Sequence, residues 1–238
     1  MKKFLFLLLS ITTFFIILNQ KAYASTVVDY FSLSGCIRDI CLEEPPGGGG
    51  DVGLVGELKI FSDGSANSGS SGSGLSSLYG SHSFITFRNM SSSNITFGKY
   101  SVPPQTEITI GTFGNREEHS GVWYNLESHY ISNYNSNENR VSISMYVNLE
   151  EISIINNYIN NNDRWSQSYN CSSFAVGIWN SVSSTTLSAF ESWLRHDTPK
   201  KLSESIKAIS NYKVRDSIQY TAPYGYYSNT DFIEVTAY

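Results

Sequence analysis

Short apolar stretches with the spacing of β-strands dominate the chain between residues 53 and 147. In one of them Phe84 and Thr86 alternate with Ile85 and Phe87, which places each pair on its own face of a strand. Turn residues such as Ser, Asn, Gly and Pro separate these stretches from one another. The pattern predicts strands at residues 53–61, 83–88, 95–97, 107–110, 121–126 and 140–147.

The pattern changes to helical spacing after residue 148. Ile152, Ile155 and Ile159 recur three or four residues apart, as on one face of a helix. Thr198 followed by Pro199 is typical of a helix start, with Thr as the cap and Pro in the first turn. Helices are therefore predicted at residues 149–160, at about 171–182 and from Thr198 onward, with a last strand near 231–236. Strands followed by helices define an α+β fold.

Two stretches of small residues interrupt this pattern. Two prolines and four glycines fill residues 45–50 and predict a linker. Residues 62–81 are mostly Ser and Gly and predict a mobile loop that ends directly against His82. We therefore expect an N-terminal segment with its linker at residues 25–52 and one folded domain at residues 53–238.

The N-terminus has the pattern of a secretory signal peptide. Lys2 and Lys3 precede an apolar run at residues 4–18, and Ala22 and Ala24 offer the small side chains that a signal peptidase reads. The run is shorter than the roughly 20 apolar residues of a spanning helix, so cleavage after Ala24 is favoured over a membrane anchor. We expect a secreted or cell-wall-associated protein that keeps no membrane span.

The charge of the chain narrows the function classes. The full chain has 16 Lys and Arg against 21 Asp and Glu, and loss of residues 1–24 removes Lys2, Lys3 and Lys21. A mature chain this acidic argues against a nucleic-acid binder or a polybasic membrane binder. It leaves cell-wall and small-molecule substrates open.

Three cysteines set the next constraint. Cys36 and Cys41 lie close enough to form a disulfide outside the cell, although so short a loop gains little from it. Their spacing, without nearby histidines, does not favour zinc, and no metal or cofactor is expected. Cys171 is left over, and an odd cysteine in an exported protein is either a buried bystander or a reactive thiol.

Cys171 occupies the predicted start of a helix. Unpaired backbone N–H groups and the positive end of the helix dipole favour the thiolate there, and the thiolate is the nucleophile. The alternative is that Cys171 is buried, since free cysteine is among the most buried residue types. The position alone does not decide between these two interpretations.

A thiolate nucleophile needs a base, and four histidines are candidates. His82 stands where the Ser/Gly stretch becomes a strand, a rigid edge suited to presenting an imidazole. His119 lies in a charged turn and is expected on the surface, and His196 precedes a helix cap and is expected to be a surface or capping residue. His129 follows a predicted strand and could be either a candidate base or a surface residue.

Two motifs resemble a known family. Gly80-Ser81-His82-Ser83-Phe84-Ile85-Thr86 resembles the histidine strand of the papain-like, NlpC-type cysteine hydrolases. Asn170-Cys171-Ser172-Ser173-Phe174-Ala175 resembles the cysteine helix of their circularly permuted branch, which also includes relatives of lecithin retinol acyltransferase. In that branch the histidine strand precedes the cysteine helix, as it does here. The resemblance spans roughly residues 53–210 and implies a permuted papain-like fold, an antiparallel sheet followed by packed helices that carry the cysteine.

The resemblance also implies a mechanism. Cys171 would attack a carbonyl carbon, His82 would take and return the proton, and a third polar group would orient the imidazole. The family places that group on a strand after the histidine strand, and Glu127 is our choice. Asn94, His119 and Asn125 stay open as alternatives. The backbone N–H of Cys171, with a neighbouring side chain, would form an oxyanion hole.

These observations favour an exported cysteine peptidase or amidase. Its amide substrate would be a peptide or a peptidoglycan-like stem peptide, with Cys171 as nucleophile and His82 as base. An acyltransferase or thioesterase on the same two residues is the nearest variant. The alternative class is a secreted binding module in which Cys171 is only buried. Trp165 and Trp179 flank the cysteine helix and are interpreted as core packing.

Overall fold

The computed structural model describes residues 53–65 and 81–236, all within one compact unit that spans Gly50–Tyr238. The predicted signal peptide, the linker at 45–50 and the Cys36–Cys41 pair lie outside the described residues, as do residues 66–80 of the Ser/Gly stretch. The description below therefore concerns the predicted folded domain.

An antiparallel sheet forms the centre of the described residues. Its eight strands follow the order β10-β7-β1-β2-β5-β6-β11-β12. The strands are β1 (Gly56–Asp63), β2 (His82–Asn89), β5 (Glu107–Phe113), β6 (Gly121–Tyr124), β7 (Val141–Val147), β10 (Lys213–Val214), β11 (Gly225–Ser228) and β12 (Asp231–Glu234). Two small antiparallel pairs lie outside it, β3 (Ile95–Phe97) with β4 (Tyr100–Val102) and β8 (Phe190–Glu191) with β9 (His196–Asp197).

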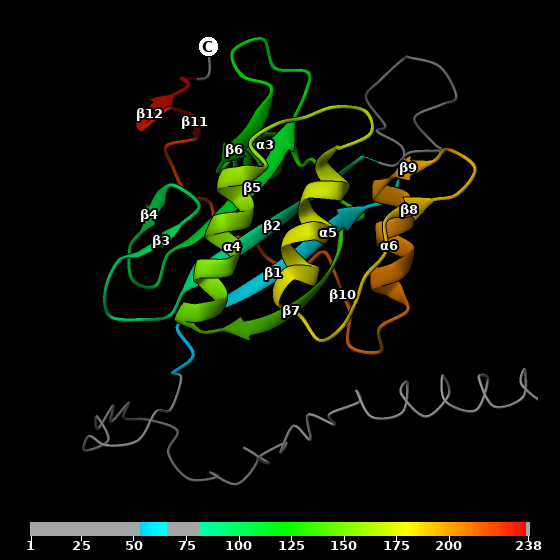
Figure 1. The fold of residues 1–238 in the computed structure, drawn as a ribbon, viewed down its shortest axis with the longest axis horizontal. Helices are drawn as coiled ribbons and strands as arrows, with labels where there is room; N and C mark the ends of the chain where they lie inside the picture. Colours follow the sequence, from blue (N-terminus) through cyan, green and yellow to red (C-terminus); the bar gives the residue numbers. More distant parts are fainter. Residues whose placement is uncertain (1–52, 66–80, 237–238) are drawn as a thin grey trace, which may run out of the picture. The chain divides into compact units, whose positions relative to one another are not determined.

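Three helices cover one face of this sheet. Figure 1 shows α4 (Leu149–Asn161), α5 (Cys171–Val182) and α6 (Pro199–Lys207) side by side across it. Ile60, Ile85 and Ile110 stand in register on β1, β2 and β5 and are fully buried. They belong to the same apolar core as Phe174 and Ile178 of α5. The core thus fixes the cysteine helix against the middle of the sheet.

The helix starts are fixed by side-chain caps. The Asn148 side chain caps α4 in a reciprocal pair with Glu151, and the Thr198 hydroxyl accepts a hydrogen bond from the Lys201 N–H at the start of α6. Asn170 caps α5 and also donates its Nδ2 to the carbonyl of Asp197, at 2.7 Å. The start of the cysteine helix is therefore tied to the segment that leads into α6.

The opposite face of the sheet carries polar contacts with the C-terminal segment. Lys59 is only 8% exposed and lies 3.4 Å from Asp216 and 3.9 Å from Glu107. The Glu107 carboxylate also accepts the backbone N–H of Gln219, at 3.0 Å. A buried lysine requires such paired carboxylates, which hold residues 216–221 against the sheet.

Most predicted elements are present, and the α+β class is confirmed. The predicted helix at 171–182 matches α5, and the predicted start at Thr198 matches α6. The strand predicted at 121–126 was wrong at its end, because β6 stops at Tyr124 and a helix, α3 (Leu126–Tyr134), follows it. The predicted start of the loop at residue 62 was also wrong, since Ser62 and Asp63 belong to β1. In the part of the chain that is described, no helix is long and apolar enough to cross a membrane.

Candidate active site

Cys171 is the first residue of α5 and is a free thiol. The Asn170 side chain accepts hydrogen bonds from the N–H groups of Ser172 and Ser173, which leaves the sulfur at the positive end of the helix. This position stabilises the thiolate, as expected for a cysteine at a helix start.

His82 is the first residue of β2, and its ring and the Cys171 side chain border the same cavity. Its ring contacts two phenylalanine rings, with centroid distances of 4.5 Å to Phe113 and 5.9 Å to Phe84. These contacts limit the rotation of the imidazole. The predicted rigid strand edge is therefore where the histidine meets the thiol.

Glu127 lies on the other side of the imidazole. Its Oε1 is 3.2 Å from Nε2 of His82, and its Oε2 accepts a hydrogen bond from the Thr109 hydroxyl at 2.8 Å. The side chain is fully buried. The predicted strand location was wrong, because Glu127 stands in the first turn of α3, where the helix dipole also favours a carboxylate.

The absence of a side chain at Gly111 makes room for this carboxylate. A Cβ added there would collide with Oε1 of Glu127 and would also approach Nε2 of His82. Gly111 lies on β5, two residues after Thr109, whose hydroxyl donates to the other carboxylate oxygen. The glycine is therefore part of what allows the two side chains to meet.

The three groups form one electrostatic unit. Burial by itself raises the pKa of the Cys171 thiol, but the charge and hydrogen bond of His82 outweigh it and lower this pKa below its ordinary value. Burial by itself lowers the pKa of His82, but Cys171 and Glu127 raise it above its ordinary value. Because Nε2 faces Glu127, Nδ1 is the nitrogen left for the sulfur. The arrangement favours a thiolate–imidazolium pair.

The alternatives for the third residue lie elsewhere. Asn94 is exposed and bonds to Ser101, while Asn125 is buried and ties the start of α3 to Thr109 of β5. His119 was expected on the open surface, but its side chain is only 21% exposed and pairs with Asp163 at 2.9 Å. Only Glu127, among the candidates considered, contacts His82.

The remaining histidines do not join the site. His129 is 8% exposed on α3, where its Nδ1 lies 3.1 Å from the side-chain nitrogen of Asn133. His196 lies on β9, and its Nδ1 is 3.0 Å from the carbonyl oxygen of Leu194. Neither is among the residues that line the cavity beside Cys171.

Serine hydroxyls form a buried chain behind the nucleophile. Ser62 donates to the carbonyl of Pro199 at 2.6 Å, so its contact with Ser83 at 2.8 Å must be donated by Ser83. Ser83 then accepts from Ser172 across 3.0 Å. Each hydroxyl has a single proton, so the direction of the whole chain is fixed. It links the first turn of α5 to β2, β1 and the start of α6.

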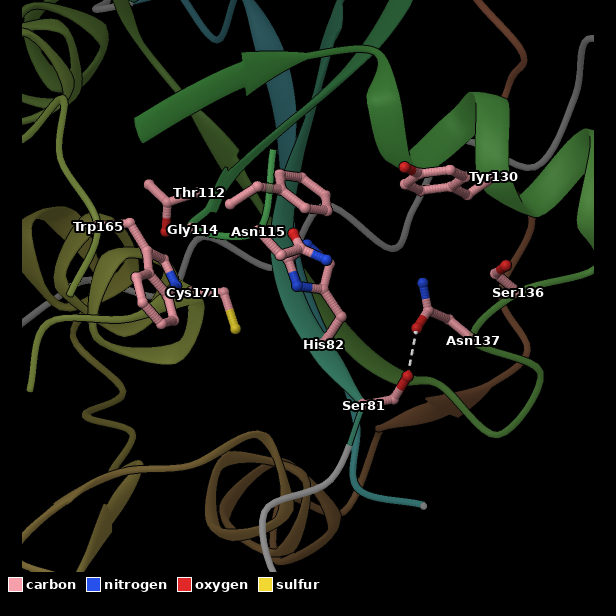
Figure 2. A pocket seen from close by; sticks show the side chains of 11 residues that line it. Ser81, His82, Thr112, Gly114, Asn115, Tyr130, Ser136, Asn137, Trp165 and Cys171 are labelled. Carbon is pink, nitrogen blue, oxygen red and sulfur yellow. Dashed lines mark hydrogen bonds between the residues drawn. The ribbon is translucent and has the colours of Figure 1, made fainter. Parts of the chain in front are cut away.

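An open cavity of about 450 Å³ gives access to Cys171 and His82 (Figure 2). Its walls are aromatic or polar and uncharged, apart from the catalytic candidates themselves. The lining residues are Ser81, His82, Thr112, Phe113, Gly114, Asn115, Tyr130, Ser136, Asn137, Trp165 and Cys171. No group of His, Cys, Asp and Glu side chains suited to a metal ion occurs among the described residues.

Trp165 corrects one prediction. Trp179 is buried, as expected for core packing, but Trp165 is 37% exposed and forms one wall of the cavity. Its indole packs so closely on Gly114 that a side chain there would collide with it. Thr112 and Tyr130, which also line the cavity, carried no signal in the sequence, because only the folded sheet brings them to the nucleophile.

The geometry places a thiol, an imidazole and a carboxylate together at the edge of an accessible cavity. This combination is suited to acyl transfer from a carbonyl substrate to sulfur. Comparison with protein-family models, with curated proteins and with solved structures finds no match to this chain.

Proposed function

We propose that this protein is an exported cysteine hydrolase with a permuted papain-like fold, and that it cleaves an amide bond. The observation that carries the proposal is the placement of the Cys171 thiol beside His82 at one cavity, with His82 paired to Glu127 at 3.2 Å. The three residues come from α5, β2 and α3, so only the folded domain brings them together. The cell wall is the nearest amide-rich polymer for an exported enzyme, and peptidoglycan stem peptides are the proposed substrate.

The reaction begins with attack of the Cys171 thiolate on the carbonyl carbon. A C–S bond forms, and the π electrons of the carbonyl move to its oxygen. When the carbonyl re-forms, the C–N bond breaks, and the His82 imidazolium gives its proton to the leaving nitrogen. Neutral His82 then takes a proton from water, which attacks the thioester and releases the carboxylic acid and the thiolate.

The order and type of the elements support the proposed fold. The histidine strand β2 precedes the cysteine helix α5 along the chain, and α5 packs on the antiparallel sheet that contains β2. This is the order of the permuted branch that the two sequence motifs resemble. The departure is the third residue, which follows β6 on a helix instead of lying on a strand.

The location of Cys171 favours an enzyme over a binding module with a buried thiol. A buried bystander would belong to the apolar core, whereas Cys171 borders the cavity together with His82. The phenylalanine contacts and the buried Glu127 also restrict the imidazole to one orientation. A structural cysteine does not require such an arrangement.

The experiment is release of peptide fragments from purified peptidoglycan, measured by mass spectrometry. The protein should release fragments, and Cys171→Ala and His82→Ala should each reduce release by at least about 10³-fold. His119→Ala is the matched control, since it removes a histidine–carboxylate pair away from Cys171, and it should act like the wild type. Undiminished release by folded Cys171→Ala would contradict the mechanism.

A further inference from the structure

Thr112 places an unpaired hydroxyl beside the nucleophile. The residue is 1% exposed on β5, and among the described residues its Oγ1 has no hydrogen-bond partner. Buried polar atoms nearly always have partners, because a missing one costs stability. An orphan hydroxyl at the wall of a cavity therefore points to a partner that arrives with the ligand.

The register of the sheet explains the position of this hydroxyl. Ile85 pairs with Ile110, and Ser83 and Thr112 lie two residues beyond that pair on their respective strands. Both therefore project from the face that α5 covers. The Ser83 hydroxyl lies 3.0 Å from that of Ser172, in the first turn of α5, and Figure 2 shows the Thr112 oxygen directed toward the side of the cavity where Cys171 and Trp165 lie.

A second donor at the same place is the backbone N–H of Cys171. It is the first N–H of α5, so no helical carbonyl can accept it. The Asn170 side chain accepts from Ser172 and Ser173 instead, and no other group in the described part of the chain accepts it. Two donors without acceptors thus lie at this cavity, one on the main chain of Cys171 and one on the Thr112 side chain that lines the same cavity.

We propose that the Thr112 hydroxyl and the Cys171 N–H together bind the oxyanion that forms during acyl transfer. The proposal rests on the proposed function only in that Cys171 is the nucleophile. When the C–S bond forms, the carbonyl oxygen becomes negative and accepts one hydrogen bond from each donor. Both donors are released when the C=O bond re-forms and the leaving group departs. The low exposure of Thr112 keeps bulk water away from the hydroxyl, which strengthens its bond to the anion.

The test compares two reactions of the same thiol. Acylation by p-nitrophenyl acetate passes through a tetrahedral oxyanion, and alkylation by iodoacetamide does not. Thr112→Val, which keeps the shape of the side chain, should slow acylation of Cys171 by about 10²-fold. Iodoacetamide alkylation should change by less than about twofold. Mass spectrometry of the modified cysteine and the burst of p-nitrophenol measure both rates.

Two further variants control for packing. Thr112→Ser retains the hydroxyl and should acylate within about threefold of the wild type. Ser203 also has a buried hydroxyl without a partner in the described residues, but it lies on α6 near Gly64. Ser203→Ala should therefore leave both reactions unchanged. The unfolding midpoint of Thr112→Val should equal or exceed that of the wild type, because valine leaves no unsatisfied hydroxyl.

The outcomes separate this inference from the proposed function. Wild-type acylation rates in Thr112→Val, or equal slowing of acylation and alkylation, would overturn the role of Thr112 as an oxyanion donor. Absence of acylation at Cys171 in the wild type would overturn the nucleophile and the inference together. If peptidoglycan is not cleaved but Thr112→Val still slows acylation alone, the oxyanion role stands and the proposed substrate fails.

Discussion

Two histidine–carboxylate pairs occur in the described part of the molecule, and they differ in what surrounds them. His119 and Asp163 are 2.9 Å apart and each about one quarter exposed or less, and Asp163 also accepts the N–H of Val122. His82 and Glu127 are 3.2 Å apart, and the carboxylate is fully buried. The first pair has the shorter hydrogen bond, yet no thiol contacts it.

The comparison shows that a histidine–carboxylate bond alone does not define an active site. The His119 ring stacks on Tyr226 at 4.7 Å, and its pair joins the start of β6 to the segment after α4. The His82 ring, in contrast, borders a cavity that the Cys171 thiol also lines. The second neighbour of the imidazole determines whether the pair holds the fold together or activates a thiol.

The largest expected difference between the pairs is in thiol reactivity. His82→Gln should slow alkylation of Cys171 by iodoacetamide at pH 6 by about 10²-fold. Without the imidazolium, the pKa of the Cys171 thiol rises in this variant, and little thiolate is present at pH 6. His119→Gln should leave the rate unchanged. The measurement is the alkylation rate from pH 4 to pH 10, read by mass spectrometry.

The direction of the pH effect follows from the two pKa shifts. In the wild type the lowered pKa of Cys171 keeps thiolate present below the ordinary thiol range, and reactivity falls only as the pH drops through that lowered value. In His82→Gln the fall should begin at a higher pH. Identical profiles for the two proteins would show that His82 does not activate the thiol.

Gly111→Ala tests the space that the active pair needs. The added methyl group would displace the Glu127 carboxylate from His82, so acylation by p-nitrophenyl acetate should fall by about 10- to 100-fold. Gly53→Ala is the matched control, because nothing lies within 4 Å of a Cβ at that position. Full acylation by Gly111→Ala would mean that the carboxylate contact is dispensable.

Glu127→Gln should have a smaller effect. Glutamine keeps an oxygen that can accept the hydrogen bond of His82 but removes the negative charge that favours the imidazolium. We expect acylation to slow about tenfold. We also expect a narrower pH range in which the thiolate and the imidazolium are present together. If Glu127→Gln slowed acylation as much as His82→Gln does in the same assay, the charge of Glu127, and not its orientation of the imidazole, would be its main contribution.

The smallest effect is expected from removing the His119–Asp163 pair. His119→Ala should leave acylation within about twofold of the wild type and lower the free energy of unfolding by about 1 kcal/mol, since one hydrogen bond at a partly exposed site is lost. Urea unfolding, followed by fluorescence, measures the change. A large loss of acylation would mean that the segment leading to Trp165 depends on this pair.

The sequence predicted the site best where local signals determine structure. The helix at Cys171 was predicted with the observed bounds, and the start of α6 follows directly from Thr198 and Pro199. His82 was predicted at a strand edge because the change from Ser/Gly residues to alternating residues is visible in the chain. These features depend on neighbours within a few positions.

Features set by distant contacts were missed or misplaced. Asn125, the residue before helix α3, has a left-handed backbone conformation. Contacts with Thr109 and Pro223 hold it there, and its side chain makes no cap bond to the helix. The preceding residues alternate like a strand, so the helix had no local signal. Trp165 was predicted in the core, but its packing on Gly114 places it at the cavity wall.

The uncharged lining of the cavity has a consequence for the conditions under which the protein works. None of the lining residues is Asp, Glu, Lys or Arg, and residues 66–80, which precede Ser81, contain no charged residue either. The thiolate and the imidazolium cancel each other, and the Glu127 carboxylate behind His82 is fully buried and does not line the cavity. Substrate capture would therefore rely on contacts that dissolved ions do not screen, and its affinity should stay nearly constant from dilute buffer to about 1 M salt. A cavity of this kind would tolerate large changes in the salinity of its surroundings.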